Sequence, residues 1–175
     1  MKKIRLELIE LLQRLGLSHF MTRKDQNVFF INNYDKILSI YEDRGCNIET
    51  DDSSAFENLL MQQREFFAEE EVRGAFPRLV SFVTQTEQML HNAQVVVSAS
   101  ASNNLNDPGS EEPSQLDEGI VESLVREFSS VWRNGIQQIN DDVLAYFANF
   151  RNGMEILKQV LTQLLLYYTR FQEII

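Results

Sequence analysis

Cysteine, proline and glycine are scarce in this chain of 175 residues, which has one cysteine, three prolines and seven glycines. A single cysteine excludes an internal disulfide framework and is typical of a reducing compartment. So few prolines and glycines argue against the frequent turns of an all-β protein. These shortages favour a fold with few turns.

Long hydrophobic runs are also absent. The longest run near the end covers residues 164–168, far short of the roughly 20 residues of a membrane-spanning helix. Glu7 and Glu10 interrupt what would be the core of a signal peptide. Any membrane association is therefore expected to be peripheral, through partners.

Positive charge is in short supply, and the net charge is −10. The excess acid lies in residues 46–119, which carry fourteen acidic and three basic side chains. Such a surface repels nucleic acid and anionic lipid over most of its length. No nucleic-acid partner is expected.

The residue patterns of catalytic, cofactor and metal sites are missing as well. His19 and His91 have no second ligand at metal-binding spacing, and Cys46 stands next to acids that would raise its thiol pKa. The acidic neighbours at 69–71 and 141–142 point around a helix and are interpreted as solvated surface. There is no glycine-rich phosphate loop and no G-x-S-x-G or H-E-x-x-H motif. The sequence predicts a protein that is not an enzyme, with no cofactor and no metal.

What the chain does have is apolar residues that recur every three or four positions, the helical period. Four helices are predicted in a first region, residues 1–97. They cover residues 4–15 up to a stop at Gly16, residues 24–44 up to Gly45, a third helix from 52 or 53 to Gly74, and a fourth with Pro77 in its first turn.

The composition then changes between Ser98 and Ser114, where small, polar and acidic residues dominate and two prolines occur. Such a segment buries too little apolar surface to offset its ordering entropy. We expect residues 98–118 to form a flexible, acidic, serine-rich loop. Shortening it should leave the thermal midpoint nearly unchanged, because loop-closure entropy grows only logarithmically with length.

Helical periodicity resumes over residues 119–175, and Trp132 falls on an apolar stripe and is predicted to be a core residue. At Asn152-Gly153 two structures are possible. Asn152 can cap a new helix, which makes a hairpin, or one helix can continue and bend near Gly153. The stripe crosses this point in phase, which favours one continuous helix. After it, an apolar seam at 157, 161, 164, 168, 171 and 175 is spaced like a coiled coil.

Adjacent aromatic residues occur at 29–30, 66–67 and 167–168. One member of each pair can face the core, and the other needs a neighbouring helix or a partner chain. A wide core stripe and a second contact face are both compatible with this pattern.

Three motifs, in order along the chain, resemble the vacuolar protein sorting-associated protein 52 family. The first is F-F-I-N-N-Y-D at 29–35, the second is F-A-N-F-R-N-G at 147–153, and the third is the segment from Leu161 to Phe171 that contains T-Q-L. The residues that carry the resemblance are Asn32, Asn33, Tyr34, Asp35, Asn149, Phe150, Gly153, Thr162 and Gln163.

The resemblance implies an all-α fold, an elongated antiparallel helical bundle of the rod-like kind found in multisubunit tethering complexes. The one long acidic loop is expected from the composition of this sequence and is longer than the family pattern has at that point. The resemblance also implies the C-terminal part of a non-catalytic subunit shared by the Golgi-associated retrograde protein (GARP) and endosome-associated recycling protein (EARP) complexes. These act in endosome-to-Golgi retrograde transport on the cytoplasmic face of the trans-Golgi network and endosomes.

The implied partners are other tether subunits, a Rab- or Arl-type small GTPase and SNAREs. Tyr167, Arg170 and Phe171, near the far end of the last helix, are the candidate partner contacts. The alternative is a generic helical adaptor or scaffold outside vesicle traffic.

Overall fold

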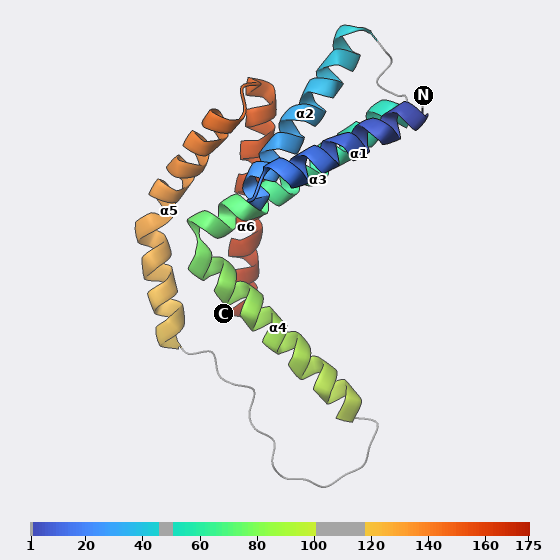
Figure 1. Ribbon diagram of the computed structural model, residues 1–175. Coiled ribbons are helices and arrows are strands. Elements are labelled where there is room, and N and C mark those ends of the chain that lie inside the picture. Colours follow the sequence, from blue (N-terminus) through green and yellow to red (C-terminus); the bar gives the residue numbers. More distant parts are fainter. Residues whose placement is uncertain (1, 46–50, 101–117) are drawn as a thin grey trace.

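The computed structural model describes residues 2–45, 51–100 and 118–175, and within these ranges it is built of helices without strands (Figure 1). The helices are α1 (Lys2–His19), α2 (Arg23–Asp43), α3 (Asp51–Ala75), α4 (Pro77–Ser100), α5 (Glu118–Tyr146) and α6 (Phe150–Ile174). The predicted all-α fold is confirmed.

Helix α6 is central to the arrangement, because it packs against α3, α4 and α5. At one end α2 lies along α3, and α1 packs against α2. At the other end α4 and the first half of α5 extend away from this group (Figure 1). The molecule is an elongated helical bundle whose two ends differ in how closely the helices pack.

Aromatic residues fill the centre of the bundle. Tyr34 of α2 and Phe56 and Phe67 of α3 are at most 2% exposed. The ring of Phe67 meets Phe147 edge-on at 5.1 Å, which ties α3 to the segment after α5. Such edge-to-face pairs add to the hydrophobic stabilisation from burial.

Two predicted helix boundaries are confirmed, Gly45 after α2 and Pro77 in the first turn of α4. Helix α2 is capped by Thr22, whose hydroxyl accepts from the Asp25 amide at 3.0 Å, and it is followed by Gly45 at φ 60°. Only Phe76 separates α3 from α4, and Pro77 is the first residue of α4, where its missing N–H costs nothing. The chain therefore bends at Phe76.

Gly16 does not end the first helix, as the sequence had predicted; α1 continues to His19. The reason for glycine here is packing. A Cβ at Gly16 would lie 2.4 Å from the ring of Phe30, and one at Gly135 in α5 would lie 2.7 Å from the ring of Phe76. Both glycines allow an aromatic ring to touch a helix backbone.

The favoured prediction of one continuous helix over residues 119–175 is wrong. Residues 147–149 are not helical and separate α5 from α6, which fold back along each other as a hairpin (Figure 1). Asn149, with extended backbone at φ −79° and ψ 107°, caps α6, so the turn comes three residues before Asn152. The in-phase stripe did not reveal the break, because a polar cap can interrupt a helix without shifting the apolar register.

The prediction that Trp132 is a core residue is also wrong, since it is 38% exposed. Further along α5, Ile139 and Val143 are 2–3% exposed. The hairpin packs tightly near its turn, whereas around Trp132 a groove separates the two helices.

The predicted acidic loop falls largely outside the described residues. Helix α4 reaches Ser100 and α5 begins at Glu118, so the predicted 98–118 segment is helical at both of its ends. Residues 101–117 are not described, and the dispensability of this segment stays a prediction.

Candidate functional site

Two of the three sequence motifs meet where α2 crosses the α5–α6 turn. The side chain of Asn149 accepts from the backbone amides of Arg151 and Asn152 and thereby caps α6. Its amide nitrogen donates to Asp35 Oδ2 at 2.8 Å. Asn32, one turn earlier on α2, donates to the Tyr146 carbonyl at 3.1 Å. Helix α2 thus holds both sides of the turn.

The start of α6 is tied to α3 by a pair of hydrogen bonds. Arg64 donates from Nε and from a terminal nitrogen to Asn152 Oδ1, at 3.0 and 2.6 Å. Asn152 is 1% exposed. Burial lowers the pKa of the Arg64 guanidinium, and Asp35 and Glu155 oppose that shift in part.

A polar cavity of about 330 Å³ opens beside these contacts, and we call it the junction cavity. It lies between α2, α3 and α6. Its wall is formed by Asp35, Leu38, Ser39, Tyr41, Glu42, Ser53, Glu57, Leu60, Arg64, Asn149, Arg151, Asn152 and Glu155. The wall therefore combines two guanidinium groups with four carboxylates.

The third motif contacts α3 through Glu69. Tyr167 donates to Glu69 Oε1 and Gln163 donates to Oε2, both at 2.6 Å, and Arg73 pairs with Oε1 at 3.1 Å. Burial raises the pKa of the Glu69 carboxyl, but the three donors lower it, and the net shift is downward. This carboxylate is therefore held in its charged form.

The structure places the three candidate contact residues mainly inside the chain. Tyr167 and Phe171 are 3% and 5% exposed, so both side chains pack mainly in the chain's own core, although Phe171 also forms part of the wall of the groove between α5 and α6. The prediction overlooked that α6 turns these positions toward α3 and α4. Arg170 is half-buried, forms a bidentate pair with Glu87 of α4 and lies over the Tyr167 ring at 4.7 Å. A partner contact of Arg170 stays a prediction.

The other motif residues are spread over both surface and core. Tyr34 and Gly153 are buried, Asn33 donates within its own helix to the Phe29 carbonyl, and Thr162 donates to the Lys158 carbonyl. Phe150 is 73% exposed. Most motif residues thus maintain the fold, whereas Phe150 faces solvent.

A partly buried charge cluster that the sequence did not suggest joins α2, α3 and α5. Lys24 Nζ lies 2.8 Å from Glu71 Oε1 and 2.7 Å from Asp142 Oδ2, and 5.1 Å from the centre of the Tyr146 ring. Burial raises the pKa of the Glu71 carboxyl more than Lys24 lowers it. Burial lowers the pKa of Lys24, but the two carboxylates outweigh this and raise it.

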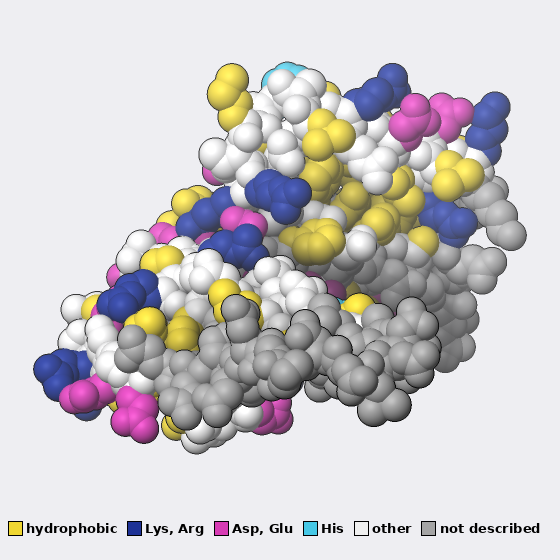
Figure 2. Space-filling view, turned by 90° about the horizontal axis from the view of Figure 1, so that it is seen from below, with side chains coloured by type: hydrophobic (Ala, Val, Ile, Leu, Met, Phe, Trp, Pro, Cys, Tyr) yellow, Lys and Arg dark blue, Asp and Glu magenta, His cyan; other side chains and the backbone are white. Residues whose placement is uncertain are grey.

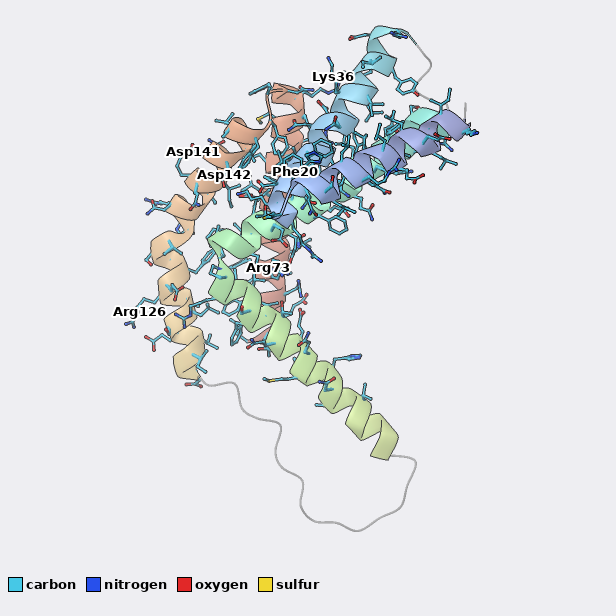
Figure 3. The ribbon with its side chains drawn as sticks, viewed as in Figure 1. Phe20, Lys36, Arg73, Arg126, Asp141 and Asp142 are labelled. Carbon is cyan, nitrogen blue, oxygen red and sulfur yellow. The ribbon has the colours of Figure 1, made fainter. Side chains whose placement is uncertain are left out.

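The interpretation of both acidic clusters as solvated surface is wrong in part. The Glu71 side chain is 4% exposed, and Glu69 is held by Tyr167 and Gln163. Asp142 takes part in the charge cluster, whereas its neighbour Asp141 accepts from Gln137 one turn away. Figure 3 shows these two acids together on α5, with Arg126 toward the other end of the helix. The sequence interpretation missed these contacts because Glu71 and Asp142 both pair with Lys24, which is distant from them in the sequence.

The outward side of the hairpin is apolar. Helix α6 exposes a row of large side chains, which we call the outer stripe: Phe150 (73% exposed), Met154 (49%), Leu161 (36%), Leu165 (64%) and Tyr168 (43%). The predicted seam therefore splits, because Leu164 and Phe171 face the core while Leu161 and Tyr168 face out.

The outer stripe leads into a groove of about 350 Å³ between α5 and α6, the hairpin groove. Its lining is mostly apolar and consists of Leu79, Leu124, Val125, Phe128, Ser129, Trp132, Tyr168, Phe171, Gln172 and Ile175. Helix α1 also exposes large apolar side chains, and Ile4, Leu6 and Leu17 are more than 60% exposed. Figure 2 shows hydrophobic side chains gathered over the half of the molecule where α1 and α3 lie.

Among the described side chains, no group of three or more His, Cys, Asp or Glu is placed so that it could hold a metal ion. Nor is any helix in the described ranges both long and apolar enough to cross a membrane. The arrangement offers surfaces for contact with other chains.

The chain is similar to several proteins named vacuolar protein sorting-associated protein 52. It is 32% identical to the human homologue over 158 residues, which is 90% of this chain and 20% of that protein. It is 34% identical to protein 52 A of Arabidopsis thaliana over 159 residues, 89% of this chain and 20% of that protein. With the Caenorhabditis elegans homologue the identity is 27% over 168 residues, 95% of this chain and 21% of that protein.

The chain thus spans about one fifth of the length of these relatives. No protein-family model matches it. No solved structure matches it either.

Proposed function

Since the chain belongs to the vacuolar protein sorting-associated protein 52 family over the part it shares with these relatives, we propose that it is part of a non-catalytic subunit of a vesicle tethering complex. The family relationship is the observation that carries this proposal, and it bears out the resemblance of the three sequence motifs. The complex would be GARP or EARP, acting in endosome-to-Golgi retrograde transport at the trans-Golgi network and endosomes.

The proposed role is mechanical. A helical bundle with separate exposed faces can position other chains at a fixed separation without carrying out chemistry. The proposed partners are other tether subunits, a Rab- or Arl-type small GTPase and SNAREs, and membrane association would be peripheral, through them.

The surface we assign to another tether subunit is the outer stripe together with the hairpin groove. Large apolar side chains at helical spacing form a face onto which an amphipathic helix packs. Leu165 and Trp132 stand on the two sides of this face, and both expose more than a third of their surface. Aromatic residues are enriched at the centres of such interfaces.

The test is affinity purification of the tagged full-length protein that contains this chain, with identification of the chains that co-purify. The unaltered protein should bring down other tether subunits. Leu165→Glu should lose at least one of them, because a buried carboxylate at an apolar interface is costly. Gln62→Glu is the matched control: it adds the same charge at an exposed polar position on α3, outside the outer stripe and the hairpin groove.

Two results would contradict the proposal. If the unaltered protein brings down no tether subunit, the proposed function is wrong. If Leu165→Glu and Gln62→Glu retain the same subunits, the assignment of the surface is wrong.

A further inference from the structure

The junction cavity holds a cation, Arg64, that has no carboxylate oxygen within ion-pair distance among the described residues. Arg73, Arg78, Arg126, Arg151 and Arg170 each have a carboxylate oxygen within 4.0 Å. Arg64 is half-buried, yet its hydrogen bonds in the described part of the chain go only to the neutral Asn152. Both bonds end on one oxygen, so three of the five N–H donors of the guanidinium stay available.

Asn152 adds a second donor at the same place. It is 1% exposed and forms part of the cavity wall, and its Nδ2 has no hydrogen-bond partner among the described residues. The two Arg64 donors fix the orientation of the amide, because a flipped amide would turn Nδ2 toward them. Buried donors without an acceptor are uncommon in folded proteins, since each costs free energy.

The other charged side chains of the cavity wall limit which anion can accept hydrogen bonds from Arg64 and Asn152. Asp35, Glu42, Glu57 and Glu155 line the cavity, against Arg64 and Arg151. This excess of carboxylates repels a doubly charged phosphate. The wall fits a ligand that carries one carboxylate and one positively charged group. The carboxylate would bind at Arg64 and the positively charged group at Glu42 or Glu57.

We infer that the junction cavity binds an acidic side chain of a partner protein, an Asp or Glu that stands next to a Lys or Arg. The volume of about 330 Å³ is at the small end of ligand pockets and fits a dipeptide. The site is distinct from the apolar surface assigned to a tether subunit, and its test does not depend on that assignment.

The experiment is an NMR titration of the ¹⁵N-labelled chain, following the Arg64 Nε–H and Asn152 Nδ2 resonances. The probe is N-acetyl-Glu-Lys-amide, and the reference is N-acetyl-Gln-Lys-amide at equal ionic strength. We expect a saturable shift of both resonances with the Glu probe and at least about tenfold weaker binding of the Gln probe, since a charge-assisted hydrogen bond is lost. Inorganic phosphate should bind more weakly than the Glu probe.

Substitutions test whether the NMR shifts come from binding in the junction cavity. Arg64→Gln should weaken binding of the Glu probe at least about tenfold, while Arg126→Gln, on the far side of α5, should not change it. N-acetyl-Glu-Lys-amide should bind more tightly than N-acetyl-Glu-Ala-amide, and Glu57→Gln should reduce this difference in affinity.

Equal shifts with the Glu and Gln probes, or tighter binding of phosphate, would overturn the inference. So would a response that does not saturate in the unaltered chain. These outcomes are read on the unaltered chain, so they remain decisive if Arg64→Gln fails to fold.

Discussion

Replacing Lys24 by Met tests whether the cluster of Lys24, Glu71 and Asp142 stabilises the bundle. The substitution keeps a long side chain but removes the only cation within ion-pair distance of Glu71 among the described residues. Breaking a fully buried ion pair costs about 3–5 kcal/mol, because the remaining charge stays buried without a partner. The side chain of Lys24 is 32% exposed and that of Asp142 is 29% exposed, so solvent screens part of this cost. We expect a loss of about 2 kcal/mol in the free energy of unfolding at pH 7.

The loss of stability caused by Lys24→Met should depend on pH, and the shifted pKa of Glu71 gives the direction of that dependence. Burial raises the pKa of Glu71 in the folded chain, and the loss of Lys24 raises it further. A carboxyl whose folded pKa is raised stabilises the fold below its unfolded pKa of 4.5, and that contribution is lost as the pH rises through the folded pKa. The penalty of Lys24→Met should therefore be largest at pH 7 and should shrink as the pH falls toward 4.5.

The assay is urea unfolding followed by circular dichroism at pH 7 and pH 5, with Lys36→Met as the matched control. Lys36 is an exposed lysine on the same helix, farther along α2 (Figure 3). Its replacement should change stability by no more than about 0.5 kcal/mol at either pH. Equal effects of the two substitutions, or a penalty of Lys24→Met that grows at pH 5, would refute the account of this cluster.

Four further substitutions test the packing and one hydrogen bond. Gly135→Ala should destabilise the chain by about 1–3 kcal/mol through overpacking against an aromatic ring, whereas Gly74→Ala, which meets nothing within 4 Å, should stabilise it by about 0.5–1 kcal/mol; both are read by urea unfolding. Tyr167→Phe should cost about 1–2 kcal/mol, because Glu69 loses a hydrogen bond; an unchanged midpoint would speak against that bond. Trp132→Ala should cost about 1–2 kcal/mol, less than a core tryptophan, and the fluorescence of the unaltered chain should be red-shifted; strongly blue-shifted emission would contradict the exposure.

The helical fold could be predicted from the sequence because its signals are local. The period of the apolar residues, Gly45 after α2 and Pro77 at the start of α4 all act within a few residues. The break before α6 was missed because its cause is only partly local. Asn149 caps the helix, but its side chain is also held by Asp35, which is 114 positions away.

The polar contacts could not be predicted, because they depend on how distant helices pack. Nothing adjacent to Glu71 in the sequence shows that Lys24 and Asp142 will approach it. The two helix-interior glycines illustrate the same limit. Gly16 looks like a helix stop until the position of Phe30 is known.

Site-specific photo-crosslinking shows whether the hairpin's apolar face contacts another tether subunit. A photoreactive phenylalanine analogue is placed at Leu165, or at the exposed Gln62 on α3, in the full-length protein in its native cells, and the cross-linked chains are identified. We expect adducts with another tether subunit from position 165 and few from position 62. The same adducts from both positions, or none with a tether subunit from position 165, would contradict the assignment of this surface.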